Sequence, residues 1–100
     1  MATVGGEFDI EREMGCTREE FLGWLPGAAA GAPIEVLGDL IRIHSGGGEV
    51  RIQIRQAPAR RLGLLSLPVL RVSMRFQGLQ ADARGEFLRR FDLFTRRGGG

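Results

Sequence analysis

The chain has 100 residues, of which 43% are hydrophobic and 26% are charged. These values are typical of one globular domain, and they exclude a disordered chain or a fibre. No segment approaches the roughly 18 consecutive apolar residues of a membrane span. The N-terminus has neither the basic start nor the apolar stretch of a signal peptide. A single cysteine cannot form an internal disulfide. We therefore expect a cytoplasmic domain over residues 1–100, ordered from about 7 to 97 and frayed at 1–6 and 98–100.

The formal net charge of +2 conceals an uneven distribution along the chain, in which all fourteen basic residues are arginine. Without lysine, P-loop and Schiff-base chemistry are excluded, and the bias toward Arg, Gly and Ala indicates bacterial coding. Residues 1–50 contain three arginines and nine acidic residues, whereas residues 51–100 contain eleven arginines and three acidic residues. A basic half suggests anionic partners. We prefer the alternative, in which acidic and basic strands of one sheet neutralise each other.

The first two elements are predicted from alternation and from a helix cap. Residues 7–14 alternate between apolar and acidic positions, which predicts a strand with one solvent-facing side. Thr17 and Glu20 are spaced as a capping box and predict the start of a helix. Pro26 and Gly27 are predicted to end that short helix.

The middle of the chain predicts a β-hairpin followed by a third strand. Gly38-Asp39 separates two apolar segments, and pairing across this two-residue turn places Glu35 opposite Arg42. Residues 49–55 alternate strictly and follow a glycine-rich turn at 45–48. On this register Arg42 faces Arg51, a like-charge pair that Glu35 is expected to offset.

The last third of the chain predicts one further strand and a long helix. Residues 57–60 are interpreted as a turn, and residues 61–67, apolar on both faces, as an inner strand or a hydrophobic loop. Residues 70–76 alternate as a strand. A helix is expected from about residue 80 to Arg97, with its core face formed by Ala83, Phe87, Phe91 and Phe94.

The predicted fold class is therefore α+β, with a curved antiparallel sheet in the order β-α-β(4-5)-α. Both helices, including the long C-terminal one, are expected to pack on one face of the sheet. This order over about residues 7–97 resembles the helix-grip and TATA-binding-protein-like folds. That resemblance implies a pocket for an apolar ligand between sheet and helix, although the phenylalanine row of the last helix predicts a closed core. The closing stretch 91–100 also resembles the tail of short bacterial proteins without an assigned activity.

Several isolated residues invite a catalytic or metal-binding interpretation, and for each we prefer a structural one. His44 is the sole imidazole, and Glu49 is expected to face it, but no nucleophile lies nearby in the sequence. Cys16 precedes a helix and occupies a hydrophobic-staple position opposite Phe21. The acidic row at 9, 11 and 13 lacks a loop to wrap a cation, so arginine partners on a neighbouring strand are expected. The turn at 45–48 lacks the Lys and the following helix of a phosphate loop.

The solvent-facing side of the predicted sheet is the most informative surface. Arginines along a sheet can follow a phosphate backbone, but no aromatic ring for base stacking is expected among them. Leucines among arginines instead favour a protein interface. The predicted binding face comprises Arg42, Arg51, Arg55, Arg71, Arg75, Leu37, Leu40, Leu62 and Leu64.

We therefore expect a non-catalytic module that binds a protein partner or forms a homodimer through this face. Nucleic-acid or anionic-ligand binding through the same arginines is the first alternative, and the apolar helix-grip pocket is the second. No cofactor, metal ion or membrane partner is expected, and no set of acid, base and nucleophile predicts an enzyme.

Overall fold

The computed structural model describes residues 9–45 and 47–99, with the side chains of the last helix described as far as residue 95. Residues 7 and 8 of the predicted first strand and the predicted frayed residues 1–6 and 100 lie outside these residues. Residues 98 and 99, also predicted to fray, instead continue the last helix. The α+β class and the predicted order of elements are confirmed. In chain order the elements are β1 (Ile10–Met14), α1 (Arg18–Ala29), β2 (Ile34–Leu37), β3 (Leu40–Ser45), β4 (Gly48–Leu62), β5 (Leu65–Gln77) and α2 (Ala81–Gly99).

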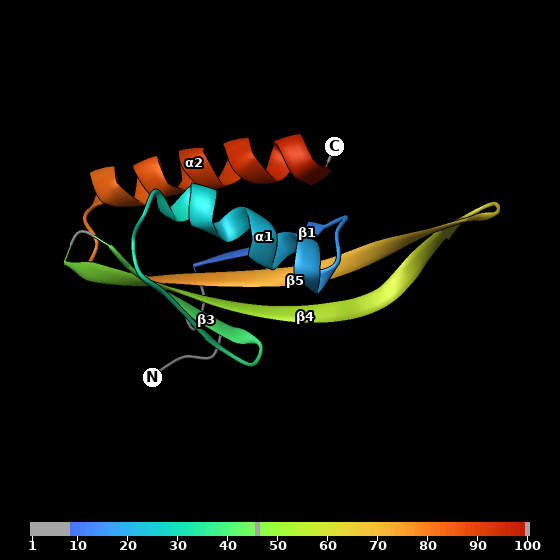
Figure 1. The fold of residues 1–100 in the computed structure, drawn as a ribbon, viewed down its shortest axis with the longest axis horizontal. Helices are drawn as coiled ribbons and strands as arrows, with labels where there is room; N and C mark the ends of the chain where they lie inside the picture. The colour runs from blue at the N-terminus through green and yellow to red at the C-terminus, as the bar shows by residue number, and fades with distance from the viewer. Residues whose placement is uncertain (1–8, 46, 100) are drawn as a thin grey trace.

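The strands form one five-stranded antiparallel sheet in the order β1-β5-β4-β3-β2. Both helices lie on the same side of this sheet, with α1 beside α2, and the far end of the β4–β5 pair extends beyond them (Figure 1). The hairpin register predicted from charge pairing is confirmed, because Glu35 is the partner of Arg42 and Leu37 is the partner of Leu40. The acidic strand β1 pairs with the arginine-bearing β5.

Phenylalanine rings fill the space between the helices and the sheet. Phe21, Phe87 and Phe91 are at most 2% exposed. Phe91 stacks on Phe87 with ring centroids 6.0 Å apart and meets Phe21 edge-on at 5.9 Å, while Phe87 meets Phe76 of β5 at 6.1 Å. Such offset and edge-on contacts are the favoured aromatic geometries. Phe94, predicted for the core face, is 36% exposed, since its ring lies over the backbone of Gly27 at the edge of the core.

One arginine lies on the helix-covered face of the sheet. In the alternation of β1, Arg12 shares the face of Ile10 and Met14. Its guanidinium forms an ion pair with Asp92 of α2 and lies 5.8 Å from the centre of the Phe91 ring. The long aliphatic stem can pack beside the core while the charged end reaches the carboxylate at its border. This pair therefore ties β1 to α2.

Helix α1 is longer than the sequence predicts. Thr17 and Glu20 form the predicted capping box, but Pro26 lies inside the helix, which continues to Ala29. Proline removes one backbone donor without forbidding helical φ angles, and the helix ends only at Ala30, which adopts a left-handed conformation. Arg90 of α2 donates a hydrogen bond to the carbonyl oxygen of Ala28. It thereby satisfies one of the unpaired acceptors at this helix end.

The predicted turn at 57–60 is wrong, because β4 continues through it to Leu62. Ala57 pairs with Val69 and Arg60 pairs with Leu67, so two residues of β4 lie opposite one residue of β5. This β-bulge contains a proline on each strand, where the missing N–H groups interrupt the ladder at little further cost. The chain turns instead at Gly63-Leu64, with Gly63 at a φ of 62°. The two strands beyond the bulge project from the body as a ribbon (Figure 1), here called the arm and comprising residues 58–68.

The cysteine is a core residue, as its staple position predicts. Cys16 is fully buried, and this burial, together with the charge of Glu20, raises the pKa of its thiol from 9.0 to about 11. Because the folded state holds the proton more tightly than the unfolded state, the stability from the neutral thiol is intact below pH 9.0. It is lost as the pH rises through the higher folded value.

We therefore expect the folded protein to resist a thiol-specific reagent at neutral pH and to react fully once denaturant unfolds it. Cys16→Ala is the control for the pH dependence, since this variant lacks the alkaline decline in the free energy of unfolding that the thiol causes. Rapid labelling of the native protein would contradict the buried placement of Cys16.

Candidate functional site: the open face of the sheet

Both described helices pack on one face of the sheet, and the opposite face is called here the open face. Successive side chains of a strand point to opposite faces, so the pairing register defines which residues the open face carries. These residues are Glu11, Glu13, Glu35, Leu37, Leu40, Arg42, His44, Glu49, Arg51, Gln53, Arg55, Ala57, Val69, Arg71, Ser73, Arg75 and Gln77.

The arginines of the open face form two rows across neighbouring strands. Arg51 of β4 is the direct partner of Arg42 on β3 and of Arg75 on β5. Four residue pairs further along the ladder, Arg55 is the partner of Arg71. Directly opposed like charges destabilise a sheet, so each row requires carboxylates beside it or a bound anion. All five arginines predicted for the binding face therefore lie on the three central strands.

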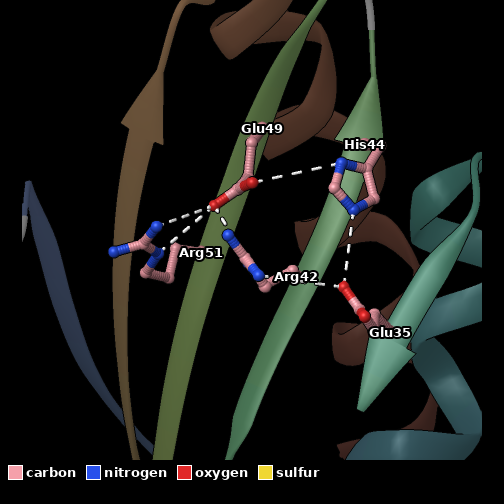
Figure 2. Close-up of polar contacts among 5 residues, drawn as sticks. All are labelled: Glu35, Arg42, His44, Glu49 and Arg51. Carbon is pink, nitrogen blue, oxygen red and sulfur yellow. Dashed lines mark hydrogen bonds and ion pairs between the residues drawn. The ribbon is translucent and has the colours of Figure 1, made fainter. Parts of the chain in front are cut away.

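Glu49 pairs with two of the three arginines of the first row, Arg42 and Arg51. Figure 2 shows its carboxylate between the two guanidinium groups, with Oε2 3.4 Å from Nε of Arg42 and 3.2 Å from both Nε and Nη2 of Arg51. Glu35, which the sequence suggested for this task, lies 4.0 Å from Arg42. His44 completes the cluster, with its ring nitrogens 3.7 Å from Glu35 and 4.0 Å from Glu49. The imidazole thus lies between two carboxylates of the open face.

The environment of Glu49 favours its ionised form. The side chain is only 15% exposed, and this burial opposes ionisation, but the hydrogen bonds and charges of Arg42 and Arg51 outweigh it and lower the pKa below its ordinary value of 4.5. A carboxylate whose folded pKa is lowered stabilises the protein above the unfolded value, and this contribution is lost as the pH falls through the folded pKa.

Glu49→Gln is therefore expected to reduce the free energy of unfolding at pH 7 by about 1–2 kcal/mol, since charge-assisted hydrogen bonds to two arginines are lost. Urea unfolding followed by Trp24 fluorescence measures this difference. The difference in free energy of unfolding between variant and wild type should decrease below pH 4.5, because the wild-type carboxylate also becomes neutral there. A difference that stays constant at acid pH would contradict the assigned role of Glu49.

A shallow depression of about 440 Å³ surrounds the second arginine row. It lies where β1, β5 and β4 run side by side. Besides Arg12, its polar lining consists of the open-face residues Glu11, Glu13, Gln53, Arg55, Arg71 and Ser73. Glu13 pairs with Arg71 at 3.4 Å and with Arg60 at 3.1 Å, which confirms the expected arginine partners of the acidic row. Among the residues that the structure describes, Arg55 has no ion-pair or hydrogen-bond partner. The depression thus offers one unpaired guanidinium to an incoming carboxylate.

The charges of the open face almost cancel. Its five arginines stand against Glu11, Glu13, Glu35 and Glu49, and the glutamates occupy both edges of the sheet as well as β4. The uneven distribution along the sequence is therefore resolved by pairing acidic β1 with basic β5. The result is a surface of alternating charge.

The four leucines of the predicted binding face do not form one cluster. Leu37 and Leu40 flank the turn between β2 and β3, whereas Leu62 and Leu64 lie at the tip of the arm. Leu40 is the partner of Gln53, and Leu62 follows Gln53 by nine residues along β4, which corresponds to about 30 Å at the rise of a strand. The missed bulge and the misplaced turn at 57–60 account for this error.

Other candidate chemistries stay apart in the fold. Cys16 lies in the core and His44 on the open face, so they cannot share a metal ion. Across the described residues, no group of three or more His, Cys, Asp or Glu side chains is placed to hold one. The segment at 45–48 is followed by strand β4, and Ser45 pairs with Gly48 as a hairpin turn requires; residue 46 lies outside the described chain.

Comparisons with known proteins place the chain in no family. No family model matches it, and neither the curated proteins nor the solved structures provide a match. Of the two described helices, neither combines the length and apolar character needed to cross a bilayer. The case for a function therefore depends on the open face and the arm.

Proposed function

We propose that this chain is a non-catalytic binding module that docks a protein, either a second copy or a different chain, through the open face of its sheet. The observation that carries the proposal is the pair of arginine rows on a sheet face opposite both described helices. Arginine is enriched at protein interfaces, where its planar group pairs with carboxylates and packs on apolar side chains. The unpaired Arg55 in the central depression supplies an anchor for a partner's carboxylate.

The charge pattern favours a protein over a nucleic acid. A phosphate backbone is held by an excess of positive charge, whereas Glu11 and Glu13 line the same depression as Arg55 and Arg71. Single-stranded nucleic acids also require rings on which bases stack. None of the residues of the open face is Phe, Tyr or Trp, and its one imidazole, His44, lies beside the carboxylates of Glu35 and Glu49. A partner surface with acidic groups at its centre and basic groups at its margins complements this pattern.

The test replaces the two arginines of the depression with glutamate and measures association. Size-exclusion chromatography with light scattering, over a range of micromolar concentrations, is expected to show a dimer of the wild type or a stable complex with a partner captured from the native host. Arg55→Glu/Arg71→Glu should abolish that association. Fluorescence anisotropy with labelled RNA and DNA at low salt should show no binding.

A matched control reverses the charge of two arginines of α2, Arg84→Glu/Arg89→Glu, on the side of the molecule away from the open face. This variant should associate like the wild type. Thermal unfolding monitored by circular dichroism verifies that both double variants fold. The proposal fails if two results are found together. The wild type is a monomer, and the Arg55→Glu/Arg71→Glu variant captures the same partners from the native host as the wild type. Salt-sensitive nucleic-acid binding lost in this variant would also overturn it.

A further inference from the structure

The arm is a two-stranded ribbon, and no other strand of the described residues 9–45 and 47–99 pairs with it. β1 pairs with β5 only as far as Leu70, and β3 pairs with β4 only from Gln53 back to Gly48. Beyond the bulge, the strands pair only with each other, through Arg60 to Leu62 and Leu65 to Leu67. Such an isolated ribbon is only marginally stable in water by itself. The arm therefore projects from the body without a core of its own (Figure 1).

The end of the arm is made of exposed leucines. Leu64 at the turn is fully exposed, and Leu62, Leu65 and Leu67 are between 40% and 63% exposed. Leu62 and Leu65 are direct partners, and Leu67 follows Leu65 by two positions, so these three share one face of the ribbon. Single exposed leucines are ordinary, but a contiguous apolar tip marks a contact surface.

The charges nearest this tip are exclusively positive in the sequence. Residues 50–81 contain no acidic side chain, and Arg60 and Arg61 directly precede the leucines. Arg60 shares Glu13 with Arg71 at the base of the arm, while Arg61 has no ion-pair or hydrogen-bond partner among the described residues. At about 3.3 Å per residue, Arg61 and Arg60 lie roughly 7 and 10 Å behind Gly63, and Arg60 is level with its partner Leu67.

From this arrangement we infer that the arm docks on an anionic lipid surface. The leucine tip enters the boundary between headgroups and acyl chains, and Arg60 and Arg61 stay at the level of the anionic headgroups. An apolar segment typically penetrates about 5–10 Å at this boundary, which matches the spacing between tip and arginines. The contact is peripheral and leaves the open face of the sheet available for a partner. It departs from the sequence-based expectation of no membrane partner, which did not foresee an exposed arm.

Two other occupants of the arm are disfavoured by the same residues. A second copy offers the tip a depression lined by charged and polar side chains, and arm-to-arm contact would bring four arginines together. A nucleic acid would pair with Arg60 and Arg61, but it accepts apolar side chains only as wedges between base steps. Four leucines at one tip form a wider apolar end than such a wedge requires.

The test measures binding to vesicles of two compositions. We expect the wild type to co-sediment with vesicles of phosphatidylcholine containing phosphatidylglycerol at least tenfold more strongly than with phosphatidylcholine alone. Leu64→Glu/Leu65→Glu should abolish binding. Arg60→Glu/Arg61→Glu should lower it at least tenfold and remove its dependence on salt, because each cation near an anionic bilayer contributes about fivefold in partitioning.

The matched control places glutamates on another exposed apolar pair, Val36→Glu/Leu37→Glu, and should bind vesicles like the wild type. In a Trp24→Phe/Leu64→Trp variant, the emission should shift to the blue with anionic vesicles and be quenched by brominated acyl chains. The proposal is overturned if the wild type does not co-sediment with anionic vesicles. It is also overturned if Leu64→Glu/Leu65→Glu leaves vesicle binding intact, or if the arm variants instead abolish dimerisation or binding to duplex DNA without affecting vesicles.

Discussion

Phe91→Ala is expected to lower the free energy of unfolding by about 3–5 kcal/mol, enough to leave a domain of this size barely folded. The ring is fully buried and contacts aromatic rings from both helices, Phe21 and Phe87. Its removal leaves a cavity that these rigid neighbours cannot fill by small shifts. It also removes the ring beneath the guanidinium of Arg12.

Urea unfolding followed by Trp24 fluorescence measures this loss, and Leu93→Ala in the same helix is the control. Leu93 is 46% exposed, so its truncation should change stability by no more than about 0.5 kcal/mol. Equal effects of the two substitutions would mean that α2 does not present Phe91 to the sheet.

Gly48→Ala is expected to be the most damaging single-methyl addition, at about 2–3 kcal/mol. Gly48 begins β4 beside the end of β5, and an added Cβ would lie 2.4 Å from the carbonyl oxygen of Gln77. Since that oxygen belongs to the backbone, the strands themselves must separate to admit the methyl group. Thermal unfolding should show a melting temperature well below that of the wild type.

Gly85→Ala tests the same chemical change where space is available. A Cβ at this position meets nothing within 4 Å, and alanine is a better residue than glycine in a helix interior. We therefore expect Gly85→Ala to stabilise the protein by about 0.5–1 kcal/mol. A Gly48→Ala variant as stable as the wild type would contradict the close approach of β4 and β5.

Local chemistry explains why much of the fold was predictable from the sequence. The capping box of Thr17 and Glu20 involves residues three apart, and the hairpin at Gly38-Asp39 is determined by turn length and by the opposed charges of Glu35 and Arg42. Each of these signals lies within a few residues of its partner. Neither requires knowledge of the tertiary structure.

The wrong predictions concern prolines that were expected to end a helix or a strand, where tertiary packing keeps the element intact. Pro26 was expected to end α1, yet burial of Ala28 and Ala29 against the core outweighs the loss of one helical hydrogen bond. Pro58 was expected to form a turn, yet the bulge accommodates it within a long strand. In both cases proline forbids one hydrogen bond without dictating the path of the chain.

The sequence predicted which arginines the open face carries, but only some of the contacts that these arginines make. Alternation placed all five arginines on one face. The dominant role of Glu49 depends instead on a diagonal contact with Arg42 and a contact with Arg51 on the same strand, which direct pairing does not consider. Arg12 was missed altogether, although a charged residue at an apolar position of an alternating strand was a usable signal. Its partner Asp92 lies on the last helix, so its identity depended on the tertiary fold.

The β4–β5 ladder has a consequence for the order of assembly. It joins residues close in sequence, so the entropy lost on closing its short loop is small and the hairpin can zip from Gly63-Leu64 inward. β1 must instead find β5 across most of the chain, since Ile10 pairs with Met74. We therefore expect the acidic strand to dock late, after the arginines it neutralises have already been brought together. Mutations in β1 should then accelerate unfolding more than they slow folding.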